Sequence, residues 1–255
     1  MINDVFIINK KRLYIYCDIR EYSDLINNWI RPYNVSKIKK YDNYLKISND
    51  ETVWKISNKE EIIKGKLKHT DLYTLFYNII SNIVLESNSI LIHSSVLCYN
   101  NIGVLILGDF NSGKTTLCLE GIKNNLNILS TDQSIISLKN NKLLLIKGSQ
   151  YMKYEDKELF IDDNNDEIEI KYIVNLVGMC DSGNLSFLEI TNKDHIVKSL
   201  FKRITWHSDI PLFTSPIMLN IDRNKIFSFL SKINIPVYNA RGDKESLINK
   251  IKEML

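Results

Sequence analysis

The residues most able to do chemistry lie in one short segment, GDFNSGKTT, at positions 108–116. Its glycines, lysine and first threonine match the pattern G-x-x-x-x-G-K-[ST], which is typical of a loop that binds nucleotide phosphates. The glycines allow backbone angles that turn the N–H groups of the loop inward, and a following helix adds its positive N-terminal dipole. The pattern therefore predicts a phosphate-binding loop made of Gly108, Asp109, Phe110, Asn111, Ser112, Gly113, Lys114, Thr115 and Thr116.

Two side chains of this loop have predicted roles of their own. Lys114 is expected to reach the β- and γ-phosphates, and the hydroxyl of Thr115 is expected to ligate Mg²⁺. The flanking sequence favours this interpretation over a chance match in a tight turn, because residues 103–107 predict a buried strand and residues 115–123 predict a helix. Strand, loop and helix thus follow in the order that the motif requires, although the motif leaves the reaction open.

Two further candidates lie on either side of the loop in the sequence. Asp132 follows a short predicted strand at 127–130, one helix and one strand after the loop. In a βαβ unit an acid there lies at the same sheet edge as the loop, where it can bind Mg²⁺ or accept a proton. The alternative is a turn residue that opens a hairpin at 135–146. His93 lies in a predicted apolar strand at 90–97, where a histidine is more often part of the core.

The composition is typical of a globular protein with its own core. The chain has 255 residues, of which 44% are apolar and 25% are charged, enough for one large domain or two small ones. The net charge of +3 comes from 33 basic and 30 acidic residues spread along the chain, which does not predict nucleic-acid binding. No apolar stretch approaches the length of a membrane span, and charges interrupt the N-terminal segment where a signal peptide is apolar. We therefore expect a cytoplasmic protein without nucleic-acid or membrane partners.

The N-terminal part of the chain has a different pattern from the rest. Residues 1–69 predict a β-rich region, with a short helix at 21–30. An apolar stripe at helical spacing then predicts a helix over 71–86. We therefore place a boundary between residues 1–69, as an accessory or substrate-docking region, and residues 70–255, as the nucleotide-binding core.

Beyond the loop the sequence alternates between predicted strands and helices. A hairpin at 135–146 is followed by strands at 170–177, 185–190 and 235–238 and by helices at 193–204, 222–232 and 244–255. Pro236 favours an edge position for the strand at 235–238, and Asp243 is the expected cap of the last helix.

The acidic segment 151–169 predicts a solvated loop rather than a second metal site. Arg203 is a candidate clamp for a phosphoryl group. Cys98 and Cys118 are expected in the core.

The order of three segments resembles a known family. His93 in LIHSSVL, the loop GDFNSGKTT and the strand LSTD ending at Asp132 resemble the kinase core of the HPr kinase/phosphorylase superfamily. The segments resemble more closely its small relatives beside peptide-biosynthesis genes, including the kinases that phosphorylate lasso peptides, which end much like NIPVYNARGDKESLINKI. The resemblance covers residues 70–255. It implies an α/β fold of mixed α+β character, with a P-loop kinase core of the HPr kinase C-terminal domain type and a small β-rich N-terminal region.

The resemblance also implies a function. It implies a phosphotransferase that uses ATP and Mg²⁺ to phosphorylate an alcohol group, a serine of a peptide or small protein. Lys114 would hold the phosphates and Thr115 the metal. His93 and Asp132 would flank the reacting hydroxyl, with Asp132 as base or metal ligand. HPr kinase relatives assemble as rings, so a homo-oligomer is a further expectation.

Two alternatives stay open. The family usually has two consecutive acids after the strand, where this chain has Thr131 and Asp132. The chain could therefore be a nucleotide-binding regulatory or partner module with little turnover. It could also be a kinase of a free small molecule such as serine.

Overall fold

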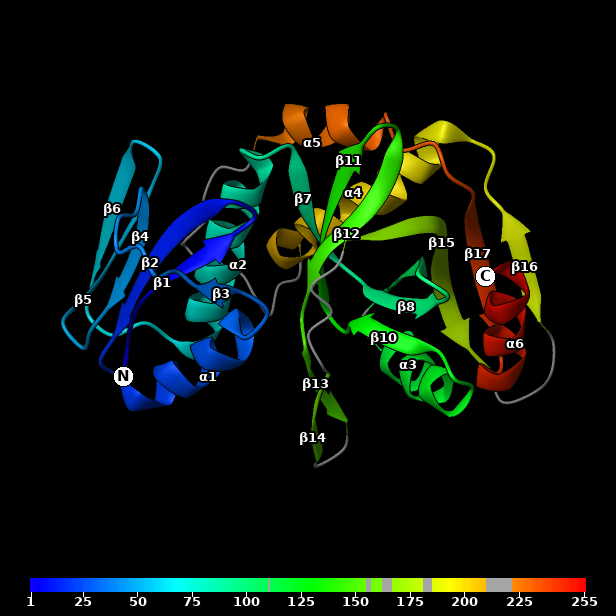
Figure 1. Ribbon diagram of the computed structural model, residues 1–255, viewed down its shortest axis with the longest axis horizontal. Helices are drawn as coiled ribbons and strands as arrows, with labels where there is room; N and C mark the ends of the chain where they lie inside the picture. Colours follow the sequence, from blue (N-terminus) through cyan, green and yellow to red (C-terminus); the bar gives the residue numbers. More distant parts are fainter. Residues whose placement is uncertain (110, 155–156, 162–166, 181–184, 210–221) are drawn as a thin grey trace. The chain divides into compact units, whose positions relative to one another are not determined.

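Mixed sheets and helices make up the chain, which confirms the predicted α/β class with mixed α+β character (Figure 1). The structure is a computed structural model that describes residues 1–109, 111–154, 157–161, 167–180, 185–209 and 222–255, with the backbone alone at 153–154, 157–158 and 205–209. The chain divides into two units, residues 1–88 with 206–223 and residues 89–205 with 224–255. Among the described residues, no helix combines the length and the apolar character needed to cross a membrane.

The first unit combines a sheet with helices. Its elements are β1 (Ile2–Ile8), β2 (Lys11–Cys17), α1 (Arg20–Ile30), β3 (Asn34–Val35), β4 (Asn43–Ile47), β5 (Glu51–Ile56), β6 (Lys59–Lys64) and α2 (His69–Leu85). The strand order is β3-β1-β2-β4-β5-β6. Asn9 and Lys10 take positive φ angles of 45° and 70° in the turn between β1 and β2, as a tight two-residue hairpin requires. The predicted β-rich region and its short helix are confirmed.

Helix α2 groups with the first unit by its contacts. The ring of Trp29 on α1 lies 5.3 Å from that of Phe76 and 5.2 Å from that of Tyr73, both on α2. The sequence placed the boundary at residues 69–70, before this helix, whereas the division by contacts follows Asn88. The apolar stripe of α2 explains the difference, because the helix packs against β1 and β5 of the N-terminal sheet.

The second unit contains the predicted phosphate loop. Its elements are β7 (Ser89–His93), β8 (Ser95–Tyr99), β9 (Ile102–Gly108), α3 (Lys114–Lys123), β10 (Asn127–Ser130), β11 (Gln133–Lys139), β12 (Lys142–Gly148), β13 (Tyr151–Tyr154), β14 (Lys157–Phe160), β15 (Ile168–Met179), β16 (Ser186–Glu189), α4 (Lys193–Asp209, which runs past the division), α5 (Arg223–Leu230), β17 (Val237–Gly242) and α6 (Lys244–Met254). A sheet runs in the order β10-β8-β9-β15-β12-β11-β7, and β17 pairs with both β15 and β16.

The strand directions bring the predicted site residues to one edge. β8 is antiparallel to both β9 and β10, so β9 and β10 run the same way and end at the same edge of the sheet. Gly108 ends β9, and Ser130 ends β10 just before Asp132. The crossover from β9 through α3 to β10 therefore places the loop and Asp132 on the same side, as the sequence predicted.

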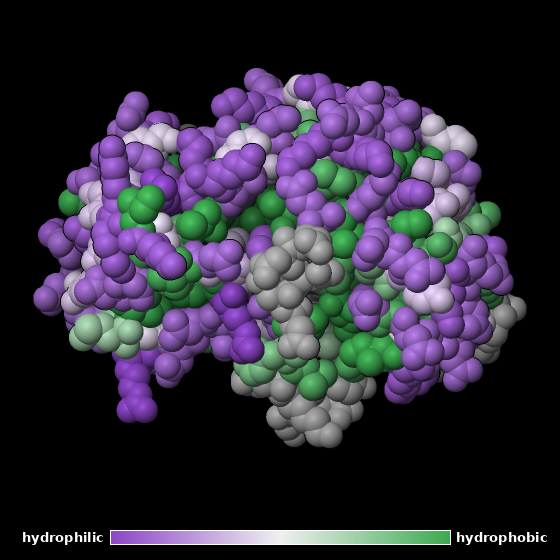
Figure 2. All heavy atoms as spheres, viewed as in Figure 1, coloured by the Kyte–Doolittle hydropathy of each residue, from purple (hydrophilic) through white to green (hydrophobic). Residues whose placement is uncertain are grey.

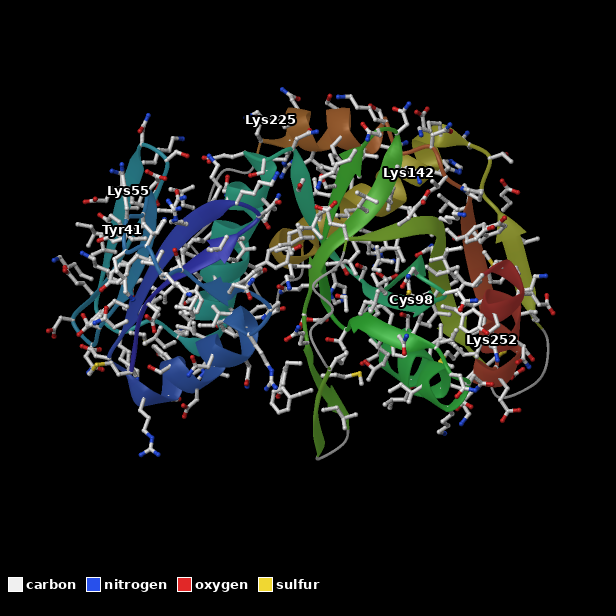
Figure 3. All side chains as sticks on the ribbon, viewed as in Figure 1. Tyr41, Lys55, Cys98, Lys142, Lys225 and Lys252 are labelled. Atoms are coloured by element: carbon white, nitrogen blue, oxygen red, sulfur yellow. The ribbon has the colours of Figure 1, made fainter. Side chains whose placement is uncertain are left out.

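Helices α3 and α6 lie side by side and share a core with β8, β9 and β15 (Figure 1). The predicted core cysteines are confirmed, since Cys118 on α3 and Cys98 on β8 are both buried. Figure 3 labels Cys98 near β8. On α6 the buried residues Leu247, Ile248 and Ile251 form the inner stripe. The surface over α6 is mainly hydrophilic (Figure 2).

Three predictions about the elements are corrected. The strand expected at 90–97 is two strands, because the backbone N–H of Ser94 donates to Asp132 O (3.1 Å) and interrupts the ladder. The segment 151–169 is not a loop throughout, since it contains the hairpin β13–β14 and the start of β15; its acids at 162, 163 and 166 lie outside the described residues. Pro236 precedes β17, which is paired on both sides and is not an edge strand.

Candidate functional site

The phosphate loop has the backbone that its sequence predicts. It joins the end of β9 at Gly108 to the start of α3 at Lys114. Asn111 and Gly113 take positive φ angles of 59° and 97°, and Gly113 is the N-cap of α3. Because glycine has no side chain to accept hydrogen bonds from the first turn of α3, those N–H groups are open to an anion. Phe110 lies outside the described residues.

Gly113→Ala is expected to lower the free energy of unfolding by about 1–3 kcal/mol and to weaken ADP binding. A Cβ at Gly113 would lie 2.2 Å from Met179 Sδ, and the φ of +97° is one that alanine rarely adopts. Urea unfolding and an ADP titration would measure both effects. Gly178→Ala is the matched control, since a Cβ there would meet nothing within 4 Å. Equal results for the two variants would contradict the prediction.

Lys114 is buried at the base of the loop. Its Nζ donates to the backbone carbonyls of Gly108 (3.0 Å) and Asp109 (3.1 Å), and the residue is 8% exposed. Burial lowers the pKa of the ammonium group, and the nearby carboxylate of Asp132 raises it. The loop thus holds a cation in place before any ligand arrives, at the position where the sequence predicts phosphate binding.

Ser112 provides a second polar group in the loop. Its Oγ is buried and has no hydrogen-bond partner among the described atoms. The side chain lies over Gly108, where a Cβ would come within 2.2 Å of this oxygen. A buried hydroxyl without a partner costs free energy unless a ligand satisfies it. A phosphate oxygen suits this position, because it would accept a hydrogen bond from the Ser112 hydroxyl.

A cavity of about 290 Å³ brings the predicted catalytic and metal residues together. Lys114 and Thr115 line it from the loop, and His93, Thr131 and Asp132 line it from the neighbouring strand ends. The loop residues Asn111, Ser112, Gly113 and Thr116 complete the lining. Residues 93 and 132, which sequence spacing alone could not pair, therefore share one space with the phosphate loop.

His93 and Asp132 form a close pair. His93 Nδ1 lies 3.2 Å from Asp132 Oδ1, with the histidine side chain 6% exposed and the carboxylate 48% exposed. Two backbone-directed hydrogen bonds fix this pair, from Ser94 N to Asp132 O (3.1 Å) and from Ser95 Oγ to Thr131 O (2.5 Å). Burial lowers the pKa of His93 to about 4, a shift that Asp132 opposes and that Lys114 and Arg203 reinforce. The imidazole is thus neutral at pH 7, and a neutral ring can donate one hydrogen bond to the carboxylate.

His93 is expected to make the protein less stable at mildly acidic pH. The unfolded chain protonates this histidine near its ordinary pKa of 6.5, whereas the folded chain does so near 4. The free energy of unfolding therefore falls as the pH drops from 6.5 toward 4. At a pH of about 4.5 the loss should reach roughly 2–3 kcal/mol.

Urea unfolding of wild type and His93→Gln across this pH range would check the prediction. The difference between the two proteins isolates the histidine from carboxylates that titrate in the same range. Parallel pH profiles for the two proteins would contradict it.

Thr131 has a structural role at the strand end. It is 5% exposed, and its Oγ1 lies 2.7 Å from Tyr151 O and 3.1 Å from Ser149 O. A hydroxyl can donate to such carbonyls, whereas a carboxylate would be repelled by both. The backbone here is therefore suited to a hydroxyl, and Asp132 is the acid that reaches the cavity.

The donor set in the cavity fits Mg²⁺ bound together with phosphates. Mg²⁺ is usually held by one or two carboxylates plus substrate phosphates and waters. The Thr115 hydroxyl and the Asp132 carboxylate both line the cavity. In the part of the chain that the structure describes, no group of three or more His, Cys, Asp or Glu side chains could hold a metal by itself. A metal here would thus depend on the phosphates of the ligand.

Arg203 lies beside the loop. Its Nη1 donates to Asp109 Oδ1 (2.5 Å), its Nη2 approaches Asn175 Oδ1 (3.5 Å), and Lys202 Nζ is 3.1 Å from the same Asp109 oxygen. The hydrogen bond from Arg203 lowers the pKa of Asp109 to about 2. Both cations neutralise a carboxylate that would otherwise repel a phosphate. Arg203 is 6% exposed, and its Nε has no partner among the described atoms.

Sequence reasoning missed a second cavity beside the loop. Besides loop residues, it is lined by Met179 at the end of β15, by Cys180 just after it, and by the start of α6 at Asp243, Lys244, Glu245, Ser246 and Asn249. No spacing signal could have found it, because α6 begins 130 residues after the loop helix does.

No protein-family model matches the chain, and no curated protein matches it either. Among solved structures, the chain is similar to the Hpr(Ser) kinase/phosphatase from Coxiella burnetii, with 14% sequence identity and a TM-score of 0.34. The match covers 64% of this chain and 91% of that one. A likeness at this level assigns neither a family nor an activity.

Proposed function

We propose that the chain is an ATP- and Mg²⁺-dependent kinase that transfers the γ-phosphoryl group to a hydroxyl, a serine of a peptide or small protein. One observation supports this most strongly. The phosphate loop with Lys114 and Thr115 shares a single cavity with the pair His93–Asp132. A nucleotide-binding module needs the loop alone, whereas a transferase also needs an acid–base group beside the phosphates.

The chain's own side chains have distinct roles in the proposed transfer. Lys114 and the N–H groups at the start of α3 bind the phosphates, and the acceptor hydroxyl lies beside Asp132. The acceptor oxygen bonds to the γ-phosphorus while the bond to the β–γ bridging oxygen breaks, so that ADP leaves. Asp132 accepts the hydroxyl proton. His93, neutral at pH 7, positions this carboxylate by donating to it.

Mg²⁺, bound with the phosphates at Thr115 and Asp132, would neutralise charge on the β- and γ-oxygens. Without Mg²⁺, Lys114 would be the one lysine or arginine, among the described residues that line the cavity, to balance that charge.

The exposure of Asp132 supports an acceptor larger than a metabolite. Its side chain is 48% exposed although its partner His93 is almost fully buried. An acid that is open to solvent can meet a hydroxyl carried by a peptide. An enclosed acid would favour a small molecule that fits inside the pocket.

Transfer from γ-labelled ATP with Mg²⁺ tests the proposal. An extract of the source cells, separated into peptide or protein and small-molecule fractions, supplies the acceptors, and wild type is compared with Lys114→Ala. We expect label in the peptide or protein fraction that depends on Lys114. Label confined to small molecules would indicate a metabolite kinase. Binding of ATP without any transferred label would favour a regulatory module.

A further inference from the structure

The second cavity beside the phosphate loop is the larger of the two. Its volume is about 840 Å³, within the roughly 300–1,000 Å³ that small-molecule sites occupy. Asn111, Ser112, Gly113 and Thr116 line both cavities. A ligand held by the loop can therefore extend from one cavity into the other without leaving the protein surface.

We propose that this second cavity binds the nucleoside part, base and ribose, of the nucleotide whose phosphates the loop holds. The inference rests on the proposed function, because it assumes that the loop binds a nucleotide. It also sets the direction of the nucleotide. The terminal phosphate lies toward Lys114 and Asp132, and the nucleoside lies between the loop and α6.

The charges in the second cavity argue against a second phosphate site. Asp243 caps α6 by accepting from Ser246 N (2.9 Å) and Ser246 Oγ (2.7 Å), so this helix N-terminus is already satisfied. Glu245 adds a second carboxylate to the lining, and Lys244 is 3.4 Å from Glu120 Oε2. A phosphate would be repelled by these acids. Ribose hydroxyls and base amino groups are donors, so they suit the same acids.

The opposite wall offers an apolar surface for the base. Met179 packs directly against the loop, since a Cβ on Gly113 would lie 2.2 Å from its sulfur. Thioethers make favourable contacts with aromatic rings. Asn249 on α6 lines the cavity as well, and its amide can both donate to and accept from a base edge. The cavity thus combines the polarizable thioether of Met179 with hydrogen-bonding groups.

Cys180 gives a readout in the unmodified protein. It lines the second cavity and is half-buried, whereas Cys17, Cys98 and Cys118 are buried. N-ethylmaleimide should therefore modify Cys180 first. We expect ADP to slow this modification by about tenfold, and tripolyphosphate, which has no nucleoside, to change it by less than about twofold at saturation. Equal protection by both ligands, or none by bound ADP, would overturn the inference.

A pair of variants on α6 tests the position independently. Asn249→Trp places an indole in the cavity. Glu253→Trp introduces the same side chain one turn further along the helix, outside the lining. We expect Asn249→Trp to raise the Kd for ADP by about tenfold or more while the Kd for tripolyphosphate stays within about twofold. Glu253→Trp should change neither constant.

The outcomes separate this inference from the proposed function. If Asn249→Trp binds ADP as well as wild type does, the nucleoside lies elsewhere and phosphate binding by the loop still stands. If wild type binds neither ADP nor tripolyphosphate, the proposed function fails and the inference fails with it.

Discussion

Lys114→Ala should abolish phosphate transfer, with a loss of at least about 1,000-fold, and should raise the Kd for ADP by about 100-fold. The ammonium group is 8% exposed and sits between two loop carbonyls, so it is positioned before the ligand arrives. Without it, the phosphates would face those carbonyl oxygens with no cation between them. Calorimetric titration with ADP and the labelled-ATP assay would measure the two losses.

The matched control for this variant is Lys123→Ala. Lys123 lies at the exposed end of the same helix, where it pairs with Glu120 (3.3 Å), and it lines neither cavity. Its removal should leave ADP binding within about twofold, because Lys123 is itself exposed and the buried Glu120 keeps a second cation, Lys244, at 3.4 Å. Thermal unfolding of Lys114→Ala would establish that the variant is folded. ADP binding that survives in a folded Lys114→Ala protein would contradict the assignment of the loop.

The loop could be predicted from the sequence because its determinants are local. Gly113 needs a positive φ, Lys114 begins a helix, and the apolar run before Gly108 forms a buried strand. Each of these follows from neighbours within about ten residues. The hairpin turn at Asn140 and Asn141 was predictable for the same reason, since both residues take positive φ angles of 52° and 61°.

The pairing of His93 with Asp132 depends on contacts that no local pattern contains. The residues are brought together by the break at Ser94 and by the pairing of β7 with β11, in which His93 lies opposite Gln133. The segment ILIHSSVL at 90–97 predicts one strand, and its division at Ser94 becomes evident only once the partner strands are known. The sequence could therefore nominate both residues but could not show that they meet.

Arg203 shows the same limit at longer range. It follows Asp109 by 94 residues, and its contact with Asp109 arises because β15 pairs in parallel with β9 and leads on toward α4. The acidic second position of the loop, Asp109, was the available signal. A carboxylate in a phosphate-binding loop favours a cation beside it, but the sequence, which indicates Arg203 as a candidate clamp, could not show that this cation is Arg203.

Asp132→Asn should reduce phosphate transfer by about 100- to 10,000-fold while ADP binding in the absence of Mg²⁺ stays within about twofold. The amide keeps the size of the side chain but cannot accept the proton of the acceptor hydroxyl. In the proposed function Lys114 and the N–H groups at the start of α3 bind the phosphates, whereas Asp132 lies beside the acceptor hydroxyl, so binding and transfer should separate. ADP titrations with and without Mg²⁺ would also measure the contribution of Asp132 to metal binding. If Asp132 is a metal ligand, Mg²⁺ should increase the affinity for ADP less in the variant than in wild type.

The decisive comparison is between Asp132→Asn and Lys114→Ala, because each role predicts a different combination of losses. The lysine variant should lose ADP binding and transfer together, whereas the aspartate variant should lose transfer alone when Mg²⁺ is absent from the binding assay. Asp194→Asn, the same change at an exposed position in the first turn of α4, controls for the loss of one negative charge. If Asp132→Asn transfers phosphate at the wild-type rate, Asp132 is a turn residue and the cavity has no base among the residues assigned here. If transfer is absent from wild type as well while ADP binds, the loop serves a binding module, and the pair His93–Asp132 only stabilises the end of β10.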